Sequence, residues 1–178
     1  MPARQPMSDL PDDPVRLTTE ELVELSMLAA QMQDPVLATH CWLVAKRRRK
    51  KSRDAILHPL IRAGLQPIDW WEQALQASQR IRKTTGGNHH LYVVLLDGYA
   101  AGSRYGLYVG ESRYTPERRF ENHKSGKHAS RHVQRKGVRL LPELYRHLNP
   151  LSRAEAKALE PQLAAVFREM GIRTEGGH

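Results

Sequence analysis

The side chains best suited to chemistry lie between Leu91 and His123. Tyr92 and Tyr108 each stand in a short apolar run with the residue pattern of a β-strand. Because side chains alternate across a strand, antiparallel pairing of these runs can bring both phenols onto one face. Arg119 and His123 follow, four residues apart and therefore on one face of a predicted helix. Arginine can hold a phosphate group through its planar fork, which lysine cannot do. The set could therefore bring two phenols, a guanidinium and an imidazole close together.

The elements that must position these groups are short. Leu91–Leu96 is an uninterrupted apolar run, typical of a strand buried on both faces. Turn-forming residues follow, and Gly106–Gly110 returns as a second strand. Pro116 is suited to a first helical turn. Val138–Leu141 is expected to form a third strand, at an edge because Pro142 closes it. The last helix should open at Ser152, where Ser152 and Glu155 have capping-box spacing.

Four motifs in this order resemble those of the GIY-YIG endonuclease family. Leu91–Val93 (LYV) stands where that family has its first tripeptide, and Tyr108–Gly110 (YVG) where it has the second. The segment RRFENH matches the family's arginine, apolar residue and histidine, and AEAKALE matches its later helix. The resemblance covers Leu91 to the C-terminus, about half of the chain. It implies an α+β fold in which a small three-stranded antiparallel sheet is flanked by helices. It also implies hydrolysis of phosphodiester bonds in DNA.

The resemblance assigns a role to each candidate residue. Tyr92 is the expected general base, and Tyr108 orients the attacking water or the phosphate. Arg119 clamps the phosphate, and His123 supports proton transfer or holds the phosphate. Glu160 is the expected metal ligand. A single carboxylate is sufficient for Mg²⁺ or Mn²⁺ if phosphate and water complete the coordination.

Two assignments leave alternatives open. Glu155 and Glu160 both border the apolar stripe of the last helix, and only the family pattern favours Glu160. Pro161 should kink that helix. The turn after the second tripeptide carries an extra residue, so Arg118 is an alternative clamp to Arg119. A chain end with His178, where the family has asparagine in some members, departs from the pattern.

The charge of the chain indicates a polyanionic partner. The formal net charge is +9 and the isoelectric point is about 10.0. The positions expected to contact nucleic acid are all lysine or arginine, and six of them are consecutive. They are Lys46, Arg47, Arg48, Arg49, Lys50, Lys51, Arg118, Lys127 and Arg131. The plainer interpretation of the run 46–51 is a solvated helix end, since cations favour helix C-termini.

Composition along the chain predicts three parts. Residues 1–17 are rich in proline and aspartate and are expected to be disordered. Residues 18–87 are expected to form a helical region that binds substrate or a partner, with Thr18 and Glu21 as a capping box. Within it, Trp70 and Trp71 could stack on bases, although core packing is the commoner role. Residues 88–178 form the nuclease-like domain.

The remaining expectations concern location and function. The single cysteine excludes an internal disulfide, and no apolar run is long enough to span a membrane, so we expect the reducing cytoplasm or nucleoid of a bacterium. The leading hypothesis is a magnesium-dependent DNA endonuclease, with RNA as an open alternative. The alternatives are a non-catalytic nucleic-acid-binding module, or an accessory subunit of a repair or mobile-element complex that binds a protein through its N-terminal helices.

Overall fold

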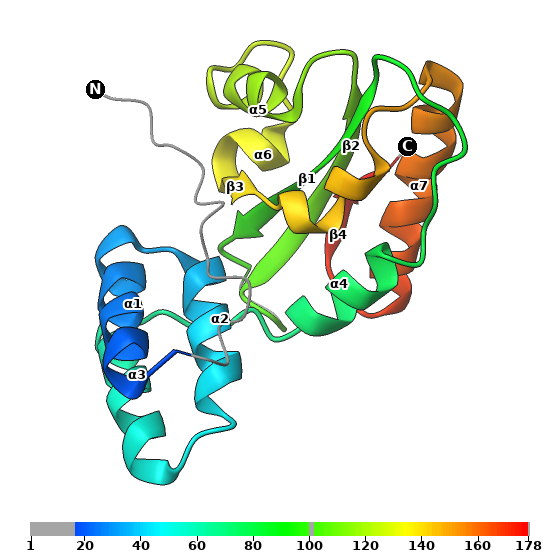
Figure 1. Cartoon of the computed structure of the whole chain (residues 1–178). Helices are drawn as coiled ribbons and strands as arrows, with labels where there is room; N and C mark the ends of the chain where they lie inside the picture. The colour runs from blue at the N-terminus through cyan, green and yellow to red at the C-terminus, as the bar shows by residue number, and fades with distance from the viewer. Residues whose placement is uncertain (1–16, 100–101, 178) are drawn as a thin grey trace. The chain divides into compact units, whose positions relative to one another are not determined.

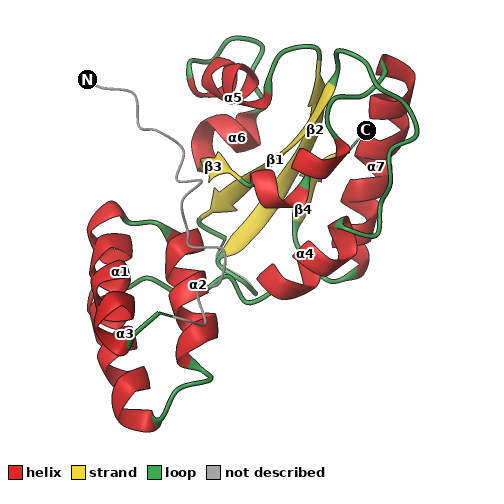
Figure 2. Ribbon diagram, in the orientation of Figure 1, coloured by secondary structure: helices red, strands yellow, loops and turns green. Residues whose placement is uncertain are grey.

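The chain forms two separate compact units in the computed structural model (Figure 1). The structure describes residues 17–99 and 102–177, so almost all of the expected disordered segment 1–17, and His178, lie outside the described residues. Contacts between residues divide the chain into Met1–Asp69 and Trp70–His178. Figure 2 shows that the first unit is helical, whereas the second contains all the described strands.

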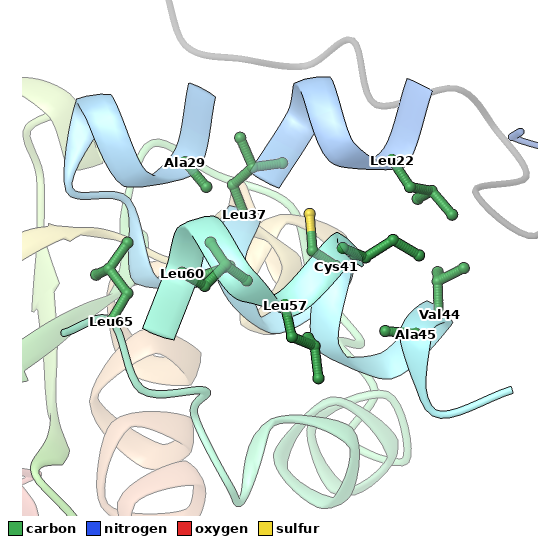
Figure 3. Close-up of a cluster of buried hydrophobic side chains, with 11 residues drawn as sticks. Leu22, Ala29, Leu37, Cys41, Val44, Ala45, Leu57, Leu60 and Leu65 are labelled. Carbon is green, nitrogen blue, oxygen red and sulfur yellow. The ribbon is translucent and has the colours of Figure 1, made fainter. Parts of the chain in front are cut away.

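The first unit contains three helices: α1 (Thr19–Met32), α2 (Pro35–Ala45) and α3 (Lys50–Arg62). Thr18 and Glu21 form the predicted capping box at the start of α1, and the Asp34 carboxylate accepts hydrogen bonds from the first amides of α2. Aliphatic side chains from all three helices point toward one another in a common core, as Figure 3 shows for Leu22, Leu37 and Leu60. Among the described residues, no helix is long and apolar enough to cross a membrane.

The second unit is built on a mixed four-stranded sheet, so the expectation of a three-stranded antiparallel sheet was wrong in detail. The strand order is β3 (Gly137–Leu140), β1 (His90–Asp97), β2 (Tyr105–Ser112), β4 (Thr174–Gly176). The three expected strands pair antiparallel, with β3 at an edge as Pro142 predicted. The additional β4 pairs parallel to β2. The α+β class itself is confirmed.

Helices cover this sheet on two flanks. Helices α5 (Pro116–Lys124) and α6 (Arg131–Lys136) pack against β1 and β3, whereas α7 (Arg153–Glu169) packs against β2 and β4. Figure 1 shows these helices on opposite flanks of the sheet. As expected from its apolar run, Leu91–Leu96 is buried throughout. Two short 3₁₀ turns, Pro142–Leu144 and Arg146–Leu148, lead from β3 toward α7.

The boundary between the units lies between Asp69 and Trp70, not at the expected position near residue 87. Trp70 and Trp71 are both buried, and the Trp70 indole N–H donates to the Tyr105 carbonyl at the start of β2. Helix α4 (Trp71–Ser78) therefore belongs to the sheet-bearing unit. Because both indoles are core residues, neither is exposed to stack on a base.

Candidate active site

The pairing of β1 with β2 places the two tyrosines on one face. Tyr92 is opposite Gly110 and Val94 is opposite Tyr108, so the tyrosines are diagonal neighbours. Their ring centroids are 6.0 Å apart. Gly110 is required by this arrangement, because a Cβ at that position would lie 2.4 Å from Tyr92 Oη. The glycine that ends the second tripeptide thus makes room for the ring of the first.

Helix α5 brings an imidazole to the same face. Thr115 caps the helix through the Arg118 amide, and Pro116 occupies its first turn. His123, one turn after Arg119, is completely buried. Its ring centroid lies 5.8 Å from that of Tyr92 and 5.7 Å from that of Tyr108. Tyr92, Tyr108 and His123 therefore form one aromatic cluster.

Hydrogen bonds around His123 define its tautomer. The Ser130 amide N–H donates to Nδ1 at 2.9 Å, so Nδ1 carries no proton. In a neutral ring the proton is then on Nε2, which lies 2.9 Å from Tyr92 Oη and donates to it. Both ring nitrogens are thus engaged within the protein. In this conformation the Nε2–H of His123 is directed at Tyr92 Oη.

The electrostatics of the cluster favour neutral forms. Burial raises the pKa of Tyr92, and the neighbouring Tyr108 raises it further, while the charge and hydrogen bonding of Arg119 act in the opposite direction. Burial, assisted by the charge of Arg119, lowers the pKa of His123 to about 4. At neutral pH the cluster therefore holds an uncharged phenol and an uncharged imidazole next to one fixed cation.

The neighbouring arginines have different surroundings. Arg119 is half-buried and acts electrostatically on both Tyr92 and His123. Arg118 is exposed, and its guanidinium lies 5.0 Å from the Tyr114 ring centroid. Arg119 therefore lies beside the aromatic cluster, whereas Arg118 lies beside the ring of Tyr114.

The two candidate carboxylates on α7 also differ. Glu155 accepts hydrogen bonds from the backbone and hydroxyl groups of Thr84 and Thr85, and those hydrogen bonds lower its pKa to about 2. Glu155 therefore fastens this loop to α7, a contact that the capping-box pattern did not predict. Glu160 is half-buried one turn further along α7.

The last described residues connect the Glu160 turn with Tyr108. A Cβ at Gly177 would lie 2.3 Å from Ala164 Cβ and 3.5 Å from the Glu160 carbonyl oxygen, so the Gly177 backbone lies against this turn of α7. A Cβ at the adjacent Gly176 would lie 3.1 Å from the Tyr108 ring. The segment Gly176–Gly177 therefore lies against both the Glu160 turn and the Tyr108 ring. Among the described residues, no group of three histidine, cysteine, aspartate or glutamate side chains could hold a metal ion.

The positions expected to contact nucleic acid are mostly exposed. Arg118, Lys127 and Arg131 are exposed in and around α5 and α6. In the first unit, the run 46–51 covers the connection between α2 and α3 and the first turn of α3. Within this run Arg48 is less exposed than its neighbours, and its guanidinium donates a hydrogen bond to the Leu17 carbonyl. Lys50 and Lys51 occupy the N-terminal turn of α3, where cations are unfavourable. A solvated helix C-terminus therefore does not explain the whole run.

One carboxylate on the tyrosine face was missed. Glu175 is the register partner of Tyr108 in the β2–β4 pairing. Its β-strand has only three residues, too few for an alternating pattern to be recognised in the sequence.

Comparison with models of known protein families, with characterised proteins and with solved structures finds no match for this chain.

Proposed function

We propose that this protein is a metal-dependent endonuclease of the GIY-YIG type that hydrolyses phosphodiester bonds in DNA. The observation that carries the proposal is the meeting of Tyr92, Tyr108, His123 and Arg119 on one face of the sheet. These residues come from three separate elements, and pKa values shifted by burial and by a specific neighbouring charge are common at functional sites.

The residues present fit a singly ligated divalent cation. Glu160 is the side chain that would hold it, because it occupies the position of the metal-binding glutamate in the family motif that AEAKALE resembles. Mg²⁺ keeps most of its waters and commonly takes only one or two protein carboxylates. When bound, Mg²⁺ or Mn²⁺ would stabilise negative charge on the leaving and non-bridging oxygens of the phosphate.

Three side chains around the phosphate would then have separate roles. Arg119 binds the phosphate through two N–H groups and lowers the free energy of the phenolate form of Tyr92. The Nε2–H of His123 donates to Tyr92 Oη and stabilises the same form. Tyr92 first loses its own proton to solvent, and the phenolate then takes a proton from the attacking water while the water oxygen bonds to phosphorus. The bond to the leaving oxygen breaks at the same time, and that oxygen takes up a proton from solvent.

One observation favours the alternative of a non-catalytic binding module. Burial raises the pKa of Tyr92 and lowers that of His123 to about 4, so Tyr92 is not ionised at neutral pH in the substrate-free protein. In such a module the aromatic cluster would serve only packing, and DNA would be bound but not cut.

Cleavage assays separate these functions. Single-stranded, duplex and branched DNA are incubated with the protein in Mg²⁺, in Mn²⁺ and in a chelator, and binding is measured in parallel. We expect cleavage that requires the metal and is abolished in Glu160→Ala, with binding retained. Glu169→Ala is the matched control, because Glu169 is an exposed carboxylate on the same helix. Absence of cleavage on every substrate, or undiminished cleavage by Glu160→Ala, would contradict the proposal.

The same proposal extends to partners and location. We infer that the basic run 46–51 of the helical unit contacts the DNA backbone, and that the remaining surface of this unit is available for a protein partner. RNA is a second substrate to be tested in the same assay. The expected location is the cytoplasm or nucleoid of a bacterium.

A further inference from the structure

A third tyrosine extends the row formed by Tyr92 and Tyr108. Gly106, Tyr108 and Gly110 alternate along β2 and share one face of the sheet. A Cβ at Gly106 would lie 2.8 Å from Cε2 of Tyr99, so the Tyr99 ring covers Gly106 as the Tyr92 ring covers Gly110. Three phenol rings therefore follow one another along this strand.

Two cations are held against the ring of Tyr99. Lys136 Nζ lies 4.0 Å from the ring centroid, and the Arg173 guanidinium carbon lies 4.3 Å from it. Lys136 also donates to the Gly98 carbonyl, which fixes its ammonium group. The cations come from the end of α6 and from the segment before β4, which are far apart in the sequence.

The charge of this cluster is not balanced. Glu175 is the single carboxylate near the two cations in the described contacts, with its oxygens 3.5 Å from Arg173 Nε and 3.6 Å from His132 Nε2. The Arg173 side chain is 59% exposed, so much of its guanidinium faces solvent. If Arg173 served only to hold β4 against α6, its guanidinium would not need to face solvent. The cluster thus presents excess positive charge at the end of the tyrosine row.

We infer that Lys136 and Arg173 form a second phosphate-binding subsite, which holds the backbone of the substrate strand beside the cleaved bond. This inference depends on the proposed function for the position of the cleaved phosphate. Gly106 and Gly110 are about 13 Å apart, from about 3.3 Å per strand residue. Because a stacked nucleic-acid strand advances about 3.4 Å per nucleotide, the subsite lies within about four nucleotides of the cleaved phosphate.

The first test measures DNA binding in a chelator, where no cleavage interferes. Each phosphate contact contributes about 0.7 to 0.9 to the slope of log K against log salt concentration. We expect Arg173→Gln to reduce that slope by about this amount and Lys136→Gln/Arg173→Gln by about twice as much. Arg153→Gln, an exposed arginine on α7, is the matched control and should leave the slope unchanged.

The second test locates the contact on the DNA. Single phosphates around the cleavage site are replaced in turn by uncharged methylphosphonates. We expect that one methylphosphonate, within about four nucleotides of the cleaved bond, weakens DNA binding by the wild-type protein. The same methylphosphonate should not weaken DNA binding by Arg173→Gln. Thermal unfolding of each variant verifies that the sheet-bearing unit is intact.

The outcomes distinguish the subsite from the proposed activity. If the wild-type protein binds DNA without cutting it and Arg173→Gln still lowers the slope, Lys136 and Arg173 form a phosphate-binding site, whereas the endonuclease proposal and the position of the site beside a cleaved bond both fail. If the wild-type protein cuts DNA but Arg173→Gln changes neither the slope nor the methylphosphonate pattern, the subsite is wrong. Absence of DNA binding by the wild-type protein would overturn the subsite as well.

Discussion

Gly110→Ala is the most direct perturbation of the tyrosine face. The added Cβ would lie 2.4 Å from Tyr92 Oη and 2.5 Å from Tyr92 Cζ, far inside van der Waals contact. Tyr92 is buried, so the ring can move only by displacing its neighbours or by leaving its hydrogen bond with His123. The substitution therefore tests whether glycine is needed for packing at this position.

The expected cost has three contributions. Overpacking a filled core costs about 1 to 3 kcal/mol. Loss of the hydrogen bond between Tyr92 and His123 adds about 1 kcal/mol. Replacing glycine by alanine also restricts the unfolded chain, which raises the free energy of unfolding by about 0.4 to 1 kcal/mol. The free energy of unfolding should therefore fall by roughly 1 to 3.6 kcal/mol, with the steric contribution dominant at the upper end.

Urea unfolding followed by tryptophan fluorescence provides the assay. In a Trp42→Phe background, the remaining indoles are Trp70 and Trp71, which are both buried in the sheet-bearing unit. Gly86→Ala is the matched control, because a Cβ at Gly86 would meet no atom within 4 Å. We expect the control to be neutral or slightly stabilising.

A double-mutant cycle with Tyr92→Leu identifies the source of the cost. Leucine lacks the ring atoms that the new Cβ would meet, so Gly110→Ala should cost less than half as much in that background. An equal cost in both backgrounds would refute the argument that Gly110 accommodates Tyr92, and so would a wild-type-like stability of Gly110→Ala.

Three further predictions follow from the charges of the molecule. The pKa of His123 is lowered to about 4, so as the pH falls below about 6.5 the unfolded chain gains a proton before the folded one. The free energy of unfolding should therefore decline between pH 6.5 and 4, and His123→Gln should flatten the decline; an unchanged profile would contradict the assignment. Arg119→Lys should lose at least tenfold more cleavage activity than Arg118→Lys, because a lysine cannot form the bidentate contact; the reverse order would identify Arg118 as the clamp. Neutralising residues 46–51 should weaken DNA binding for all sequences and flatten its salt dependence, as measured by titration at several salt concentrations, and unchanged affinity would remove this run from the DNA-binding surface.

Local patterns were sufficient to predict much of the sheet-bearing unit. The apolar run at Leu91–Leu96 and the glycine-bounded run at Gly106–Gly110 predicted β1 and β2, because strand formation here depends on consecutive buried side chains. Pro142 predicted that β3 lies at an edge, since proline cannot donate a ladder hydrogen bond. The placement of Tyr92 and Tyr108 on one face followed from strand alternation.

Other features depended on contacts between distant segments. Trp70 and Trp71 assign α4 to the sheet-bearing unit through their burial and through the contact with Tyr105, which no local composition change marked. The engagement of Glu155 by Thr84 and Thr85 likewise joins residues about 70 positions apart. The domain boundary was misplaced because it was inferred from local composition alone. The predicted cap of α7 is present, since the Glu155 amide donates to the Ser152 hydroxyl, and only the partners of the Glu155 carboxylate were not foreseen.

The amino-acid sequence was enough to indicate which residue types meet at the site, because strand alternation and helix periodicity are local properties. The tertiary structure alone decided which residue of each type lies beside Tyr92 and Tyr108. Arg119 rather than Arg118 approaches Tyr92, the Ser130 amide selects the tautomer of His123, and the parallel pairing of β4 brings Glu175 beside Tyr108. Each of these choices depends on the direction and register of packed elements, which a one-residue change would reverse without altering the local pattern.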